Sequence, residues 1–98
     1  MISHLLLRPE AEADLAEAYE WYEQRRAGLG HSLLLSVEAT LASIQENPSL
    51  FPVVHRNIRR ALIRRFPFGV YYLIEGETVV VLAVFHASRD PKRWQARS

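Results

Sequence analysis

Apolar residues recur along the chain with two different periods, and these divide it into helical and extended parts. The first part, from Pro9 to Gly28, has its apolar residues three and four positions apart, at Ala11, Leu15, Ala18, Tyr19 and Tyr22. This spacing gives a helix one apolar face. A proline suits the first turn of a helix, and a glycine suits its end. We therefore expect a helix over residues 9–26.

A second helical pattern follows the glycines at positions 28 and 30. Its apolar face is formed by Leu33, Leu34, Val37, Leu41 and Ile44. Asn47-Pro48 ends it, since the residue before a proline disfavours helical geometry. Two helices joined by so short a turn pack antiparallel as a hairpin. Residues 48–54, which contain a second proline, are expected to form a loop.

The remaining apolar segments predict extended structure, with strands at residues 2–7, 58–66, 70–74 and 78–85. Glu75-Gly76 is a turn signal, so the last two strands form an antiparallel hairpin. Pro67 limits the arginine-rich strand before them to an edge or a broken position. Asp90-Pro91 opens a short helical turn that contains Trp94. We predict a single α+β domain over residues 1–98. Its two layers, in the order β-αα-βββ, are an N-terminal strand and helical hairpin packed on a small antiparallel sheet.

The predicted sheet is apolar on both faces. Alternation in the last strand puts Val79, Val81, Ala83 and Phe85 on one face, and Val80, Leu82, Val84 and His86 on the other. One helical hairpin covers only one of these faces. The other face is then covered by a dedicated partner, by the tail from Ala87 to Ser98 with Trp94, or by self-association.

Composition narrows the function classes. The 98 residues are 49% hydrophobic and 23% charged, which is typical of a globular protein. The chain has no cysteine, which excludes disulfides, thiol nucleophiles and cysteine-ligated metals. Its longest apolar run is far shorter than the roughly 20 residues of a membrane span. We therefore expect a cytoplasmic protein without membrane association.

The net charge of +1 conceals a strong segregation of charge. Residues 1–50 carry three basic and eight acidic side chains, a balance of −5, whereas residues 51–98 carry nine and three, a balance of +6. Eleven of the twelve cations are arginine, which binds carboxylates and phosphates bidentately. The two halves either neutralise each other within the fold, or the basic half binds an acidic surface or a nucleic acid.

Few residues offer chemistry. The histidines at positions 4, 31, 55 and 86 are scattered, as are the glycines, so we expect no metal site, phosphate loop or cofactor. One catalytic set for metal-free RNA cleavage remains: His86 as general acid or base, with Arg64 or Arg65 and Arg89 as cations. Arginines 59, 60, 64 and 65 are better interpreted as a binding surface than as catalytic groups.

Several motifs in this order resemble the RelE/ParE superfamily of toxins from type II toxin–antitoxin modules. They cover nearly the whole chain and comprise Ala11 to Leu15, Trp21-Tyr22, Gly28-Leu29-Gly30, Asn47-Pro48, Phe51-Pro52, Arg60 to Phe68, Val70-Tyr71-Tyr72, Val84 to Pro91, and Trp94. The resemblance implies a helical hairpin on a small antiparallel sheet. It also implies an acidic, partly disordered, ParD-like antitoxin that forms a hetero-oligomer with the chain, and a role in plasmid stabilisation.

The superfamily divides by target. RelE-like members cleave messenger RNA on the ribosome, and ParE-like members inhibit DNA gyrase without being nucleases. Residues 68–72 carry no arginine or lysine, where the ribonucleases typically hold a catalytic one, and the ending from Arg89 to Trp94 is similar to the ParE branch. The resemblance therefore favours a gyrase poison. His86 keeps the ribonuclease as an alternative, and a non-catalytic nucleic-acid-binding module is a third. The residues expected to contact target or antitoxin are Arg59, Arg60, Arg64, Arg65, Tyr72, His86, Arg89 and Trp94.

Overall fold

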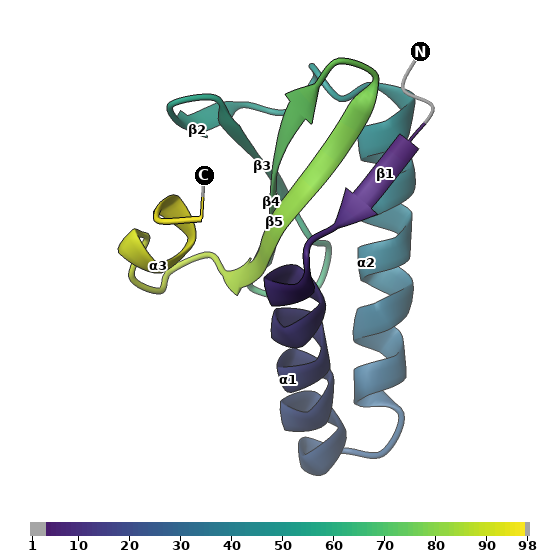
Figure 1. Cartoon of the computed structure of the whole chain (residues 1–98). Coiled ribbons are helices and arrows are strands. Elements are labelled where there is room, and N and C mark those ends of the chain that lie inside the picture. The colour runs from purple at the N-terminus through teal and green to yellow at the C-terminus, as the bar shows by residue number, and fades with distance from the viewer. Residues whose placement is uncertain (1–3, 98) are drawn as a thin grey trace.

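The computed structural model describes residues 4–97, which form two layers with a short helix on the outer side (Figure 1). The antiparallel hairpin consists of α1 (Pro9–Arg25) and α2 (Leu29–Glu46). The sheet has five strands in the order β1-β5-β4-β3-β2. Their bounds are β1 (His4–Leu7), β2 (Val53–His55), β3 (Ile58–Leu62), β4 (Phe68–Glu75) and β5 (Thr78–His86), and α3 (Lys92–Gln95) follows β5.

The predicted α+β fold class is confirmed, with two differences in the sheet. β1 pairs parallel with β5, from His4 opposite Thr78 to Leu7 opposite Val81, while all the other pairs are antiparallel. β2 lies at the end of the segment expected to be a loop, and it is short and irregularly paired. Of the strand expected at 2–7, residues 2 and 3 lie outside the described residues.

The helical hairpin is fixed at its turn. Both carboxylate oxygens of Glu23 accept hydrogen bonds, from the N–H groups of Gly28 and Gly30, each at 3.0 Å. Gly28 has a φ of 90°, which a residue without a side chain adopts most easily. At Gly30 a Cβ atom would lie 2.8 Å from the Tyr19 carbonyl oxygen, so a glycine here lets the two helices approach closely.

A β-bulge overturns the strict alternation expected in the last strand. Tyr72 pairs with Val81 and Tyr71 pairs with Ala83, so Leu82 is the extra residue. Such a residue reverses the facing of all that follow it in the strand. Val81 and Val84 consequently share the face under the helices, whereas the opposite face carries Val80, Leu82, Ala83 and Phe85. His86 is therefore turned back toward the helical side.

The chain covers the second face of the sheet with its own C-terminal segment. α3 lies on the opposite side of the sheet from α2 (Figure 1). Trp94 is 5% exposed and stacks on Tyr71, with ring centroids 4.3 Å apart. The other buried residues of this face are Ile58, Leu73, Val80, Leu82, Ala83 and Phe85. Of the three coverings considered for this face, the structure shows the tail.

The arginine-rich strand ends earlier than predicted. β3 stops at Leu62, and Arg64 and Arg65 lie in the turn that leads to β4. Two features end it: Arg65 takes a left-handed φ of 72°, and Pro67 has no N–H to donate to a neighbouring strand. No helix within residues 4–97 is both long and apolar enough to cross a lipid bilayer.

Candidate functional site

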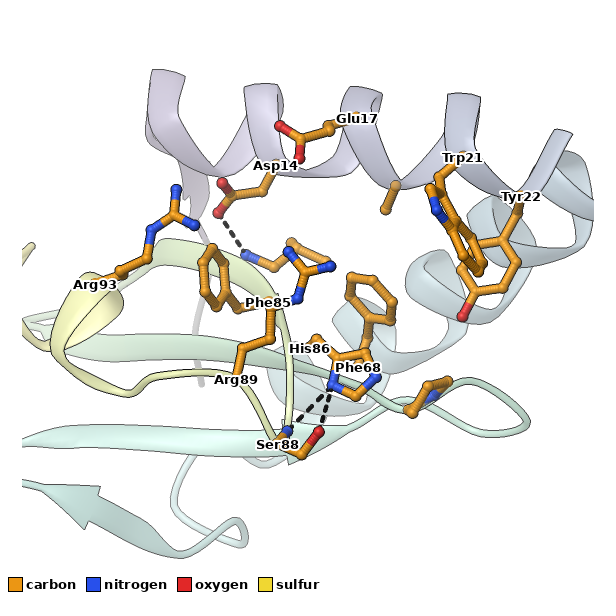
Figure 2. A pocket seen from close by; sticks show the side chains of 13 residues that line it. Asp14, Glu17, Trp21, Tyr22, Phe68, Phe85, His86, Ser88, Arg89 and Arg93 are labelled. Carbon is orange, nitrogen blue, oxygen red and sulfur yellow. Dashed lines mark hydrogen bonds between the residues drawn. The ribbon is translucent and has the colours of Figure 1, made fainter. Parts of the chain in front are cut away.

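A groove with a volume of about 390 Å³ lies between α1 and the end of β5 (Figure 2). It forms where β1 ends, because β1 pairs only with Thr78–Val81 and leaves the rest of that edge of β5 to other groups. Its lining consists of Asp14, Glu17, Ala18, Trp21, Tyr22, Pro67, Phe68, Val84, Phe85, His86, Ser88, Arg89 and Arg93.

The basic part of the groove is built by the segment at and after the end of β5. Figure 2 shows His86 with Ser88 beside its ring. The Ser88 N–H donates to His86 Nδ1 at 3.2 Å, and the Ser88 hydroxyl lies 2.8 Å from the same nitrogen. Because Nδ1 accepts these bonds, the neutral ring carries its proton on Nε2. Arg89 is exposed, and its side chain has no partner among the described residues.

The middle of the groove is aromatic. Trp21 is 50% exposed, and its ring meets that of Tyr22 edge-on at 4.9 Å. The Tyr22 ring in turn meets Phe66 at 5.0 Å and Phe68 at 6.0 Å. Burial raises the pKa of the Tyr22 hydroxyl. These rings present an apolar surface that is large, rigid and partly open to solvent.

Asp14 closes the acidic end of the groove, and we did not single it out as a site residue from the sequence. One of its oxygens accepts a hydrogen bond from the Val84 N–H at 3.1 Å, and its two oxygens pair with Arg97 at 2.5 and 3.2 Å. Arg97 also donates to the Leu82 carbonyl at 3.1 Å. Two side chains thus occupy the backbone edge of β5 that a neighbouring strand would otherwise take. The available signal was the position of Asp14, three residues after Ala11 and four before Ala18, on the buried stripe of α1.

Arg97–Asp14 is the single ion pair recorded over residues 4–97. The suggestion that the acidic and basic halves neutralise each other is therefore wrong at the level of direct contacts. Arg26, Arg56, Arg64, Arg65 and Arg89 make no side-chain hydrogen bond or ion pair within that range. Most of the segregated charge remains on the surface.

Two predicted contact residues instead hold the loop after α2. Arg59 donates to the carbonyl oxygens of Ser49, at 3.1 Å, and Phe51, at 2.6 Å. Tyr72 is completely buried, and its hydroxyl donates to the Pro48 carbonyl at 2.6 Å. Our expectation that Tyr72 contacts a partner is corrected, because Tyr72 lies on the strand face under the helices and offers no surface.

The same expectation for Trp94 is corrected for the same reason, because its ring is buried against Tyr71. Arg60 lies on the α3 side of the sheet, and its Nε is buried without a hydrogen-bond partner among residues 4–97. Its stem crosses Gly69, where a Cβ atom would lie 3.0 Å from Arg60 Cγ.

The candidate catalytic set is only partly brought together. His86 and Arg89 both line the groove, whereas Arg64 and Arg65 do not. Over residues 4–97 no group of three or more histidine, aspartate or glutamate side chains is placed to hold a metal ion. The groove offers one histidine, two arginines and aromatic rings, which suit recognition of an anionic or aromatic partner.

We predict that Tyr72→Phe lowers the free energy of unfolding by about 1 kcal/mol, because the Pro48 carbonyl loses its donor. Burial raises the pKa of Tyr72, an effect that Arg59 partly opposes. The folded chain then holds this proton more tightly than the unfolded chain, so stability falls as the pH rises above about 10. The variant should show a shallower alkaline fall in urea denaturation from pH 8 to 11.

Tyr19→Phe is the matched control, because the Tyr19 hydroxyl makes no hydrogen bond within the described residues. If the stability of Tyr72→Phe fell with rising pH as steeply as that of the original chain, the assignment of the alkaline fall to Tyr72 would be wrong.

Comparison with known proteins gives one consistent result. Residues 5–91 match the family model described as the ParE toxin of the type II toxin–antitoxin system parDE. A relative, Toxin ParE2 of Mycobacterium tuberculosis, is 28% identical over 97 residues, which is 98% of this chain and 92% of the relative.

Solved structures show the same fold. The chromosomal ParDE system from P. aeruginosa superposes with a TM-score of 0.77 at 17% identity, covering 87% of this chain and 96% of that one. The intact E. coli RelBE toxin–antitoxin complex gives 0.67 at 15% identity, covering 88% and 98%. Isolated E. coli RelE gives 0.64 at 15% identity, covering 95% and 93%.

Proposed function

The chain belongs to the ParE toxin family of type II toxin–antitoxin systems, and from this premise we propose that it arrests growth by binding and poisoning DNA gyrase. An antitoxin neutralises it in our proposal. Family membership supports the toxin role. The choice of gyrase over messenger RNA rests on the arrangement of the cationic side chains.

The observation that carries this choice is the separation of the candidate nuclease residues. Metal-free cleavage of RNA needs an acid or base and cations around one phosphate. His86, Arg89 and Arg93 share the groove, where the Arg93 guanidinium lies over the Phe85 ring, but Arg64 and Arg65 lie in the turn before β4 and do not line it. β4 itself, from Phe68 to Glu75, carries no lysine or arginine. A binding role fits this groove better than a catalytic one.

The same groove is the surface we assign to the antitoxin. Its aromatic middle suits apolar side chains, and the exposed Arg89 and Arg93 suit the carboxylates of an acidic segment. A segment that folds on binding can span such a surface, giving a hetero-oligomer. The P. aeruginosa and E. coli neighbours are themselves a ParDE system and a RelBE complex.

A paired assay on antitoxin-free protein tests the target. We expect loss of gyrase supercoiling with transcripts left intact in a translating extract. His86→Ala should weaken gyrase inhibition by less than about tenfold, since removal of a general acid or base costs about 10²–10⁴.

Cleavage of transcripts only when ribosomes are present, abolished by His86→Ala, would overturn the proposal in favour of the nuclease. Steeply salt-dependent binding to any polynucleotide, without either activity, would instead favour a nucleic-acid-binding module. Arg56→Gln is the control for a substitution outside the groove and should act like the original chain in each assay. Arg56 is exposed in the turn between β2 and β3 and does not line the groove.

A further inference from the structure

A second cavity lies where the start of α2 meets the turn between β3 and β4. Its volume is about 330 Å³, and we call it the corner pocket. Its lining shares no residue with the groove and consists of Arg26, Leu29, Ser32, Leu35, Ser36, Arg65 and Phe66. None of these side chains is acidic.

The fold brings two arginines from opposite halves of the chain to this pocket. Arg26 directly follows α1, while Arg65 belongs to the turn before β4. The turn is anchored on α1 by the edge-on contact of Phe66 with Tyr22, whose ring centroids are 5.0 Å apart. The corner is therefore a fixed feature of the packing between the layers.

The positive charge at the corner has no counter-charge. Arg26 and Arg65 are exposed, and neither makes a side-chain hydrogen bond or ion pair within residues 4–97. Glu23 is the acidic residue nearest to Arg26 along the chain. Both of its carboxylate oxygens accept hydrogen bonds from the N–H groups of Gly28 and Gly30. Two like charges that line one cavity repel each other, and a bound anionic group removes that repulsion.

The other lining residues of the pocket are three apolar side chains and two serines. Leu35 is 54% exposed although it lies within α2, and Leu29 and Phe66 are half-buried beside it. The Ser32 hydroxyl is already engaged, since it donates to the Gly28 carbonyl at 3.3 Å. Apolar side chains that line one pocket with two guanidinium groups complement a ligand that carries an apolar side chain between negative charges.

We propose that the corner pocket binds an acidic peptide segment, which places an aliphatic side chain against Leu35 and carboxylates on Arg26 and Arg65. Guanidinium groups pair with carboxylates through two parallel hydrogen bonds. A peptide fits better than a nucleic acid, because Phe66 packs edge-on against Tyr22 and the pocket has no other ring on which a base could stack. This inference rests on the pocket alone and does not depend on gyrase being the target.

The test is a titration of the ¹⁵N-labelled chain, followed by NMR, with a synthetic twelve-residue peptide of glutamate and leucine. We expect saturable shifts of the amides of Arg26, Leu35 and Phe66. The double variant Arg26→Gln/Arg65→Gln should weaken binding about tenfold or more, and Leu35→Ser should weaken it several-fold. Arg56→Gln, which removes an equally unpartnered arginine elsewhere, should bind like the original chain. Thermal melts check that each variant folds.

Three outcomes would overturn the inference. In the first, the amide shifts would map to the groove or be absent. In the second, a peptide with glutamine in place of glutamate would bind equally well. In the third, a short single-stranded oligonucleotide would bind the corner pocket more tightly than the peptide. All three outcomes are measured by peptide or oligonucleotide binding to the chain alone. Failure of this inference is therefore distinguishable from failure of the gyrase assay.

Discussion

Replacement of Trp94 by alanine is expected to lower the free energy of unfolding by about 3–5 kcal/mol, the range for removing a large buried aromatic side chain. Trp94 is 5% exposed and stacks on Tyr71 at 4.3 Å, with the His55 ring edge-on at 6.1 Å. Its loss leaves a cavity and opens the second face of the sheet to water. Urea denaturation at neutral pH measures the change, and increased binding of a hydrophobic dye would report the uncovered face.

The matched control is Trp21→Ala, which removes the same side chain from a half-exposed position. We expect this variant to lose clearly less stability than Trp94→Ala, since burial sets the cost. Equal losses for the two variants, or a loss below about 1 kcal/mol for Trp94→Ala, would mean that α3 does not hold the sheet face.

The helical layer was the most predictable part of the fold. The three- and four-residue spacing in α1 and α2 is a local signal, and Pro9, Gly28 and Pro48 mark the ends of the helices in the sequence itself. Both predicted helices agree with the structure to within about a residue at most ends. The hairpin of β4 and β5 was predictable for the same reason, since Glu75-Gly76 marks its turn.

The sheet was less predictable because its details depend on distant residues. The bulge at Leu82 leaves no mark in an unbroken run of apolar residues, yet it decides which way His86 faces. The parallel pairing of β1 with β5 joins the first strand to the last, which lie more than 70 residues apart in the sequence. β2 is short, and its pairing partner in the sheet is β3. Neither pairing has a sequence pattern of its own.

The candidate site shows the same division. Residue type drew attention to His86 and Arg89, and the structure brings both into the groove. Residue type also favoured Tyr72 and Trp94, but burial removes both from the surface. The feature that sequence reasoning missed is the Asp14–Arg97 pair, because it links α1 to Arg97, a residue that belongs to none of the motifs.

Asp14→Ala is expected to lower the free energy of unfolding by about 2–3 kcal/mol, because one change leaves two donors unpaired. The side chains of Asp14 and Arg97 are 12% and 18% exposed, so water does not fully replace the lost bonds. The Val84 N–H loses its acceptor, and Arg97 loses its counter-charge while it still bonds to the Leu82 carbonyl. The C-terminal segment should loosen first, since Arg97 is its last described attachment to α1.

A double-mutant cycle with Arg97→Ala separates the pair from the rest of the site. We expect a coupling energy of about 1–3 kcal/mol, as for residues in one hydrogen-bond network. Glu17→Ala is the control on the same helix, since Glu17 is exposed without a partner in the described structure and should change stability by less than about 0.5 kcal/mol. Additive losses in the cycle would show that Asp14 stabilises β5 through Val84 alone. Faster amide hydrogen exchange over residues 92–97 in Asp14→Ala would instead locate the effect in the C-terminal segment, which covers the second face of the sheet and contributes Arg93 to the groove.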